Sequence, residues 1–590
     1  MCGIAGLMTT DANTPSQAVL ERLQAALAHR GPDGSGYHLS GNVGMVQARL
    51  AIIDLVTGDQ PLYEPDGAAL VGNGEIYNYI ELRAELAAEI EFATHSDCEI
   101  PLHLFRREGT DFTRRLRGMY ALAIHDPTTG HLVLARDPFG IKPLYYVETA
   151  SCFAFASEPQ ALIRAGLIRA ELAPPPRNEL LQLQFTTGRD TIYTGIKRVL
   201  PGETVVVVEG RVVERHRRDA LPSGAPRPMD EATALAELDR VLHDSVLMHQ
   251  RSDVPYGMFL SGGVDSTTVL SLMAELNDRP VKAFTIGFSS NQAADERPAA
   301  RAAAESVGAE HVELEFREAD FWHLLPEVAA ALDDPAADYA VLPTWKLARA
   351  AQDAGLKVIL SGEGGDELFA GYGRYRSVMR PWWAGGKMLR ARGNFDGLGL
   401  LRGHPTGWRD GMVAADVRAA GAGRTRLQIA QATDCADWLP NDLLTKLDRC
   451  LMHFGIEGRT PFLDPEVAEF AFRLPDDLKV RDGLGKWLLR RWLQSRMPAA
   501  DALARKKGFT VPVAEWLRKR GQTLGPLVAR QPGIQEICVP DAVEKLYASM
   551  DDKRHGFAAW SLLFYALWHR AHILRRPAEG DVFQTLSVLG

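Results

Sequence analysis

The stretch YGMFLSGGVDSTTVLSLMAEL (256–276) decides the fold of the larger part of this chain. It is typical of a buried strand that ends at Leu260, followed by a tight turn containing glycine and a helix that starts near Ser266. The main-chain amides of 261–266 would point at one spot at the helix N-terminus, where the helix dipole favours an anion. The stretch therefore predicts a phosphate site.

Three residues of this turn fit phosphate chemistry. Gly262 and Gly263 allow the backbone to approach a ligand closely, and Asp265 can hold Mg²⁺ against phosphate oxygens. An ordinary strand-to-helix turn is the alternative. The sequence contains no GxxxxGK[ST] motif and no dinucleotide-binding fingerprint, which argues against a kinase or a dehydrogenase.

Downstream of the turn, strands and helices alternate, which predicts a parallel sheet with helices on its faces and ligands at the carboxyl ends of its strands. Strands are expected at 254–260, 281–287, 310–315 and 357–360, and helices at 266–276, about 295–307 and on to 354. Residues 382–426 are rich in Gly and Arg, and we expect a variable excursion or loop, with a basic docking surface as the alternative. Amphipathic helices are expected from there to about His572.

Upstream of the turn, residues 43–217 are dominated by short strand-like runs, the last two being LLQLQF (180–185) and ETVVVVEG (203–210). Helical stretches at about 16–28, 78–89 and 97–108 interrupt them, so an α+β layered domain is expected. Four prolines in RDALPSGAPRPMDEA then mark a linker. The predicted division is a domain at 1–217, a linker at 218–232 and a second domain at 233–590.

Composition excludes several classes of protein. The 590 residues are 46% apolar and 24% charged, and 66 Lys and Arg against 75 Asp and Glu give a formal net charge of −9. This is the wrong sign for a general nucleic-acid binder. No run approaches the roughly 18 apolar residues of a membrane span, and the N-terminus lacks a signal peptide pattern. Six scattered cysteines favour a reducing compartment. We expect a cytoplasmic protein with neither nucleic-acid nor membrane partners.

The amino terminus, MCGIAG, carries a second chemical signal. Removal of Met1 would leave the thiol of Cys2 and a free α-amino group on one residue, and the amine can serve the thiol as a base. A small buried hydrophobe is the usual role of a lone cysteine. Further segments nevertheless follow in order: HRGPDGSG (29–36), ARLAIID (48–54), NGEIYN (73–78), SDCE (96–99) and RDPFGIKPLYY (136–146).

These segments resemble the class II glutamine amidotransferase domain, an N-terminal-nucleophile fold of two packed sheets flanked by helices (αββα). The resemblance implies that Cys2 attacks the side-chain amide of glutamine, while Asn73 and Gly74 hold the developing oxyanion. The glutamine-binding residues that it implies are Arg49, Ile52, Ile53, Asn73, Gly74, Glu75 and Asp97, with Arg49 at the substrate carboxylate and Asp97 at its ammonium. A turn glycine and a surface arginine are the alternatives for Gly74 and Arg49.

The SGGVDS turn resembles the pyrophosphatase-type loop of enzymes that cleave ATP to AMP and pyrophosphate. FTIGF (284–288), LSGEGGDELFAGY (360–372) and GIEGRTPFLD (455–464) match the synthetase domain of the asparagine synthetase family. The cofactors implied are ATP and Mg²⁺, the metal at Asp265 and Asp366. The ATP-binding residues implied are Leu260, Ser261, Gly262, Gly263, Asp265, Ser266, Ile286, Ser361, Gly362 and Asp366.

By the same resemblance, Glu363 supports formation of an acyl-adenylate and removes a proton from ammonia, although a solvated turn is its alternative. Lys486 is a candidate for stabilising charge on phosphorus, against a solvated lysine on an amphipathic helix. Lys506 and Lys507 are candidates for closing over the triphosphate. Asp338 is a candidate for meeting a substrate ammonium, with a helix-initiating acidic cluster as the alternative.

The predicted reaction consumes a carboxylate, ATP and glutamine, and yields an amide, AMP, pyrophosphate and glutamate. L-Aspartate is the leading acceptor, and another carboxylate of peptide, antibiotic or cell-surface pathways is the alternative. Relatives that close β-lactams carry Tyr where this chain has Glu363. Because free ammonia is lost to water, an apolar passage between the two sites is expected. A non-catalytic sensor on this scaffold is the alternative of another class, and a homodimer is expected by analogy.

Overall fold

The computed structural model describes residues 2–11, 13–288, 295–403, 405–421, 423–504, 511–550 and 552–588. Its amino-terminal part contains two six-stranded sheets of antiparallel strands, in the orders β10-β8-β9-β1-β3-β2 and β12-β11-β7-β6-β5-β4. The strands are β1 (Cys2–Thr9), β2 (Gly34–Ser40), β3 (Val43–Arg49), β4 (Leu62–Tyr63), β5 (Ala69–Ile76), β6 (Gly118–Asp126), β7 (His131–Arg136), β8 (Tyr145–Glu148), β9 (Cys152–Ala156), β10 (Ile196–Arg198), β11 (Glu203–Val208) and β12 (Arg211–Arg217).

Helices cover the outer face of each sheet. The helices α1 (Gln17–Leu27) and α4 (Pro159–Arg164) pack on the first sheet, while α2 (Tyr79–Leu86) and α3 (Ile100–Glu108) pack on the second. Apolar side chains from both sheets fill the space between them, among them Ile4, Met45, Val71 and Ala123. The order helix, sheet, sheet, helix confirms the predicted αββα sandwich.

The second part contains a five-stranded parallel sheet in the order β15-β14-β13-β16-β17. Its strands are β13 (Tyr256–Phe259), β14 (Lys282–Phe288), β15 (Glu310–Phe316), β16 (Val358–Leu360) and β17 (Glu457–Arg459). The side chains of β14 alternate between two cores, because Phe284 and Ile286 face one and Ala283 the other. The alternation of strands and helices along the sequence therefore predicted the parallel sheet and four of its strands, whereas β17 was not predicted as a strand.

Helices cover both faces of the parallel sheet and make up most of the other elements of this part. They are α6 (Glu231–His249), α7 (Val264–Leu276), α8 (Arg297–Ser306), α9 (Glu318–Ala331), α10 (Val341–Asp353), α11 (Gly365–Leu368), α12 (Gly373–Met379), α13 (Asp410–Ala419), α14 (Arg426–Thr433), α15 (Thr445–Met452), α16 (Pro465–Arg473), α17 (Asp476–Lys479), α18 (Trp487–Arg496), α19 (Val513–Ala529), α20 (Pro532–Ile537), α21 (Pro540–Ala548), α22 (Lys553–His572) and α23 (Val582–Ser587). A π-helix, Asp434–Leu444, connects α14 to α15, and β18 (Val480–Arg481) pairs with β19 (Leu484–Gly485). Among the described residues, none of the helices has the length and apolarity needed to cross a membrane.

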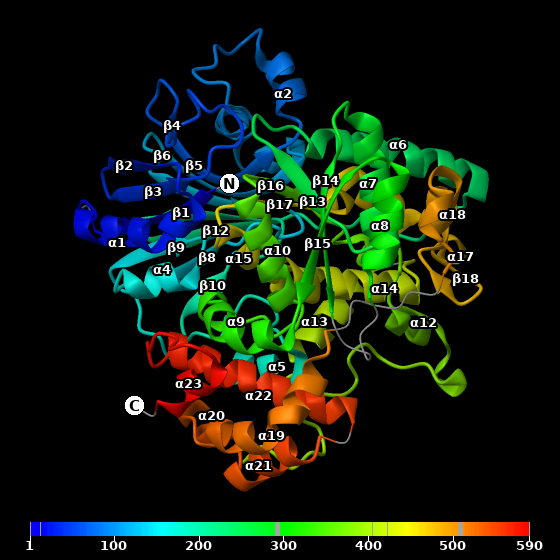
Figure 1. Cartoon of the computed structure of the whole chain (residues 1–590). Helices are drawn as coiled ribbons and strands as arrows, with labels where there is room; N and C mark the ends of the chain where they lie inside the picture. Colours follow the sequence, from blue (N-terminus) through cyan, green and yellow to red (C-terminus); the bar gives the residue numbers. More distant parts are fainter. Residues whose placement is uncertain are drawn as a thin grey trace.

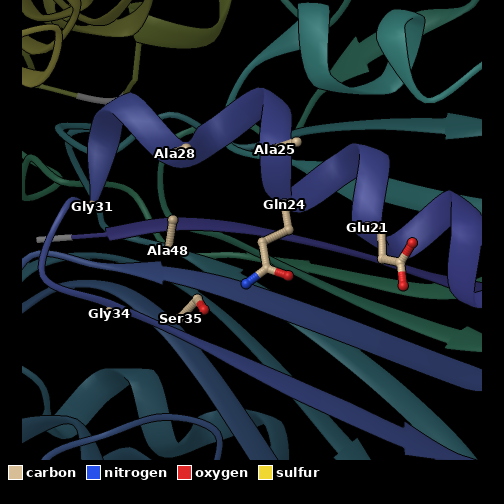
Figure 2. Close-up of a pocket in the computed structure, with 8 residues that line it drawn as sticks. All are labelled: Glu21, Gln24, Ala25, Ala28, Gly31, Gly34, Ser35 and Ala48. Carbon is tan, nitrogen blue, oxygen red and sulfur yellow. The ribbon is translucent and has the colours of Figure 1, made fainter.

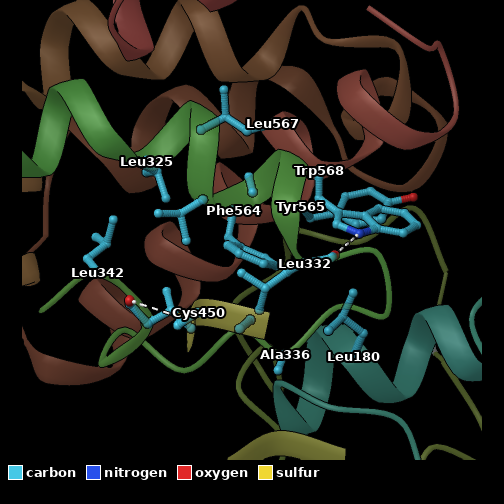
Figure 3. Packing of buried hydrophobic residues seen from close by; sticks show 14 of the residues in the cluster. Leu180, Leu325, Leu332, Ala336, Leu342, Cys450, Phe564, Tyr565, Leu567 and Trp568 are labelled. Carbon is cyan, nitrogen blue, oxygen red and sulfur yellow. Dashed lines mark hydrogen bonds between the residues drawn. The ribbon is translucent and has the colours of Figure 1, made fainter. Parts of the chain in front are cut away.

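The two parts of the chain share their cores. The blue and cyan elements of the amino-terminal sandwich lie against the green parallel sheet, and the orange to red helices α19 to α23 gather at the bottom of the view (Figure 1). Figure 3 shows part of this packing: Phe564 and Leu567 of α22 lie beside Leu325 of α9, and Leu180 of the amino-terminal part reaches the same cluster. The indole of Trp568 donates to the carbonyl of Leu332 at 2.9 Å.

The structure corrects one predicted strand and refines a predicted loop. LLQLQF (180–185) is not a strand, because residues up to Leu183 belong to the helix α5 (Pro174–Leu183). Prolines occupy the first turn of α5, where their fixed φ and missing N–H favour a helix start, and the Leu-Gln alternation fits either period. The 382–426 excursion contains the helix α13, and it runs into α14 at Arg426.

Candidate active sites

Cys2 lies at the start of β1, with its thiol between the two sheets of the sandwich. Its main-chain nitrogen donates to Oδ1 of Asn73 at 3.1 Å, and the amide of Gln47 donates to its Sγ at 2.9 Å. Cys2 is 5% exposed and Asn73 is fully buried. Within the described part of the chain, Nδ2 of Asn73 has no hydrogen-bond acceptor. This buried amide therefore presents a free donor beside the thiol.

Burial raises the pKa of the Cys2 thiol, an effect that Arg49 partly offsets. The thiol is therefore held neutral until a base removes its proton. Gln47, which contacts the thiol directly, was missed from the sequence, since a single glutamine on a strand carries no distinctive signal. Gly74 follows Asn73 on β5, and a side chain there would meet the carbonyl oxygen of Met119 at 2.1 Å. Gly74 thus has a packing role whatever else it does.

The residues predicted to bind glutamine gather around this thiol. Arg49 pairs with Cys2 across β1 and β3, and its guanidinium contacts Asp59 at 2.7 Å and the carbonyl of Asp54 at 2.5 Å. Asp97 accepts from the main-chain nitrogen of Ile76 at 2.7 Å, and burial raises its pKa to about 6. Arg49 thus lies opposite Cys2 on the neighbouring strand, and Asp97 is held against the end of β5, the strand that carries Asn73.

Other residues predicted to bind glutamine contact the second part of the chain. Glu75 forms an ion pair with Arg459 of β17 at 3.5 Å, and burial raises its pKa well above the ordinary value. Ile52 and Ile53 are buried, and the carbonyl of Ile52 accepts from the main-chain nitrogen of Asp253 at 3.0 Å. The amino-terminal site is thus anchored to the parallel-sheet part.

A groove of about 280 Å³ lies close to this site, between α1 and the strands β2 and β3 (Figure 2). It is lined by Glu21, Gln24, Ala25, Ala28, Gly31, Gly34, Ser35 and Ala48. Ala48 belongs to the core on the α1 side, whereas its neighbour Gln47 contacts the thiol, so the groove is on the other face of the sheet. It does not open onto Cys2.

The glycine turn of the second part lies at the carboxyl end of β13, as predicted. The hydroxyl of Ser266 accepts from the main-chain nitrogen of Ser261 at 3.1 Å and contacts the hydroxyl of Ser261 at 3.0 Å. Gly262 has a φ of +67°, and a side chain there would meet the main-chain nitrogen of Ala300 at 2.7 Å. The helix α7 begins at Val264, directly after Gly263. The turn therefore points the N-terminus of α7 at the end of the sheet.

The segment that follows β16, at the start of LSGEGGDELFAGY (360–372), lies beside this turn because β16 neighbours β13 in the sheet. A side chain on Gly362 would lie 2.9 Å from the main-chain nitrogen of Ser266. The main-chain nitrogen of Ser361 donates to the carbonyl of Arg459 at 2.9 Å, and its buried Oγ has no partner among the described residues. Leu260 directly follows β13 and Ile286 lies on the adjacent β14, and both are buried. Four of the predicted ATP-binding residues, Leu260, Ile286, Ser361 and Gly362, thus lie on or directly after adjacent strands of the parallel sheet.

Lys486 connects the two loops. Its ammonium pairs with Asp265, and it contacts Asp366 at 2.6 Å. It is not on the exposed face of a helix, because it caps the N-terminus of α18 with a φ of +59° and is buried. The two carboxylates raise its pKa although burial opposes them. Asp265 and Asp366 are therefore close enough to share one cation.

Glu363 lies next to a lysine that the sequence did not reveal. Lys446 of α15 contacts Asp338 at 2.9 Å and Glu363 at 3.9 Å. Burial raises the pKa of Glu363, whereas Lys446 lowers it. The structure joins Asp338, an open candidate in the sequence, to Glu363 through this ammonium. Lys506 and Lys507 lie outside the residues that the structure describes. Among the described residues, no group of three or more His, Cys, Asp or Glu side chains is arranged to hold a metal ion.

The fold and its two sites define a two-part enzyme, with a glutamine amidotransferase domain followed by a nucleotide-binding synthetase domain. Residues 1–217 match the glutamine amidotransferase domain family, and residues 237–570 match asparagine synthase. The chain belongs to the asparagine synthase family, and it is an amidotransferase of the glutamine-hydrolysing asparagine synthetase type.

Three relatives illustrate the similarity. A putative glutamine-hydrolysing asparagine synthetase of Mycobacterium tuberculosis H37Rv is 35% identical, covering 96% of this chain and 97% of its own. Glutamine-hydrolysing asparagine synthetase 1 of Bacillus subtilis 168 is 31% identical over 98% of each chain. Amidase chry2 of Gibberella zeae is 30% identical, covering 64% of this chain and 60% of its own.

Proposed function

We propose that this protein transfers the amide nitrogen of glutamine to a carboxylate that it activates with ATP, most simply L-aspartate, giving L-asparagine, AMP and pyrophosphate. One observation carries the proposal. Asn73 uses its Oδ1 on the main-chain nitrogen of Cys2 and keeps a buried, unpartnered Nδ2 beside the thiol. A buried donor without an acceptor is costly, and an oxyanion formed at the thiol would satisfy it.

In the glutaminase half-reaction, Cys2 Sγ attacks the side-chain amide carbon of glutamine. The proton passes from the thiol to the α-amine exposed by removal of Met1 and then to the leaving ammonia. Asn73 Nδ2 and the main-chain N–H of Gly74 stabilise the oxyanion, and water then hydrolyses the thioester to glutamate. Arg49 and Asp97 hold the α-carboxylate and α-ammonium of the substrate.

In the synthetase half-reaction, a substrate carboxylate oxygen attacks the α-phosphorus of ATP, and pyrophosphate leaves. The turn at 261–266 and the N-terminus of α7 receive the phosphates. Lys486 stabilises the negative charge that develops around the phosphorus. Because Lys486 is buried, this electrostatic attraction is stronger than it would be in water. Ammonia then attacks the acyl carbon, Glu363 accepts its proton, and AMP leaves.

Asp265 and Asp366 are suited to Mg²⁺. Two carboxylates combined with substrate phosphate oxygens are the usual way in which proteins bind this ion. Both contact the one ammonium of Lys486, so their oxygens converge on a common point. Bound Mg²⁺ would neutralise phosphate charge there, and Lys486 would turn to the phosphates.

A protected route between the two sites is part of the proposal. Apolar residues of the amidotransferase domain, including Leu50 and Met119, belong to the same buried cluster as Leu260 and Leu360 of the parallel sheet. Such a continuous apolar contact would favour neutral ammonia over ammonium and would exclude water.

A different acceptor carboxylate is the second candidate. Amidase chry2, which is similar over 64% of this chain, carries a name that does not include asparagine. Pyrophosphate release, measured with glutamine across a panel of carboxylates, decides between the two. Highest kcat/KM with L-aspartate supports the first candidate, and release with another acid alone supports the second.

The division of roles is tested with Cys2→Ala. This variant should lose glutamine-driven amide formation and retain ammonia-driven formation, because the synthetase site is untouched. Cys152→Ala, which changes a buried cysteine elsewhere in the same domain, should retain both. If Cys2→Ala loses both nitrogen sources while Cys152→Ala keeps both, the division of roles is refuted.

A further inference from the structure

We propose that Lys446 is a positioning residue of the synthetase site, which holds the Glu363 carboxylate ionised and oriented for proton removal from ammonia. The proposal rests on the role given above to Glu363. Lys446 lies 83 positions after Glu363 in the sequence and on a different element, so no local motif connects the two.

The ammonium of Lys446 is buried and is surrounded by carboxylates. Its side chain is only 6% exposed, and a buried ammonium is retained only where carboxylates compensate for its lost hydration. The compensating groups are Asp338 at 2.9 Å and Glu363 at 3.9 Å. Asp442, one turn earlier on the π-helix, is also close enough to act on its charge. Lys446 is therefore a buried cation that contacts two carboxylates, those of Asp338 and Glu363, and senses the charge of a third.

The carboxylates around Glu363 oppose its ionisation. Burial, Asp338, Asp366 and Asp265 all raise its pKa, and Lys446 acts in the opposite direction. Lys486 is committed to Asp265 and Asp366. Without Lys446, the Glu363 carboxyl would thus face burial and three like charges. A protonated Glu363 could not accept a proton from ammonia.

The geometry also orients Glu363. The ammonium of Lys446, on α15, donates to Asp338 at 2.9 Å and lies 3.9 Å from the Glu363 carboxylate. On the far side, Asp442 is held by the indole of Trp438, which donates to it at 2.8 Å. The hydrogen bond to Asp338 therefore fixes the ammonium of Lys446, which from that position attracts the Glu363 carboxylate and restrains its side chain.

Two variants move the predicted pH dependence in opposite directions. Lys446→Met removes the favourable charge, so the acid limb of ammonia-driven AMP formation should move to higher pH by at least about 1 unit. Asp338→Asn removes an unfavourable charge and leaves Lys446 to Glu363, so the limb should move to lower pH. Both are measured at a fixed concentration of free NH₃ with saturating carboxylate and ATP. Lys446→Arg should restore the wild-type limb.

Controls separate this proposal from loss of fold and from failure of the proposed function. Glutamine hydrolysis by the same preparations reports on folding and should stay within about twofold of wild type. Lys346→Met removes a lysine–aspartate ion pair of similar length, 2.8 Å, from a more exposed position in the same domain and should leave the limb unmoved. An unmoved limb in both Lys446→Met and Asp338→Asn, or movement in the same direction, overturns the proposal. Absence of AMP formation in the wild type with every carboxylate instead refutes the proposed function.

Discussion

Replacing Asn73 with alanine removes a buried side-chain donor beside Cys2 that has no acceptor among the described residues and is therefore available to an oxyanion. Loss of a single oxyanion donor typically lowers kcat by about 10²–10³, which corresponds to about 2.7–4 kcal/mol of transition-state stabilisation. Asn73 is fully buried, so solvent cannot replace the missing donor. We therefore expect glutaminase kcat to fall by about 10²–10³ in Asn73→Ala, with a smaller change in KM.

The assay measures glutamate release without ATP, and AMP formation with ammonia as nitrogen source. Ammonia-driven AMP formation should be unchanged in Asn73→Ala, because the residue lies in the other domain. Asn78→Ala is the matched control: its side chain bonds Arg115 and Arg117 at 2.9 and 3.0 Å, and it should affect stability but not glutaminase kcat. A wild-type glutaminase kcat in Asn73→Ala would refute the assignment of the oxyanion donor.

Three further predictions concern both sites and their interface. Glu363→Gln should reduce amide formation by about 10²–10⁴ while glutamine hydrolysis continues, and normal amide formation would remove its role as proton acceptor. Burial raises the pKa of Asp97 to about 6, so the carboxylate loses its charge as the pH falls through 6. The KM for glutamine should therefore rise below pH 6 in the wild type and not in Asp97→Asn. The same dependence of KM on pH in both proteins would contradict the role of Asp97 in binding the substrate ammonium. Arg30 is fully buried and contacts Asp448 and Glu158, both at 2.8 Å. Arg30→Met should therefore lower the free energy of unfolding, measured in urea, by about 3–5 kcal/mol. A decrease of less than about 1 kcal/mol would contradict an essential role of this contact between the domains.

The sequence predicted the elements whose local signal agrees with their tertiary role. The strand and helix around SGGVDS were predicted within two residues, since apolar period, glycine turn and helix start all coincide there. LLQLQF (180–185) was predicted as a strand because its apolar pattern fits two periods, and only the prolines at the start of α5 favour the helix. Local signals thus fail where two periods compete.

Residues that act through distant partners were invisible in the sequence. Gln47 and Lys446 belong to unremarkable segments, and only the pairing of β1 with β3 and the packing of α15 beside the Glu363 loop bring them to the sites. Lys486 was predicted as a candidate, but its place as the cap of α18 between two aspartates depends on the tertiary fold. Long-range ion pairs therefore set the limit of sequence reasoning here.

The most direct test of the central claim follows the oxygen atoms of the acceptor acid. The acid is supplied with ¹⁸O in its carboxylate, together with ATP and glutamine, and the products are analysed by mass spectrometry. Activation as an acyl-adenylate predicts one ¹⁸O atom in AMP for each amide formed and none in inorganic phosphate. Label in inorganic phosphate, or in neither product, would contradict the account.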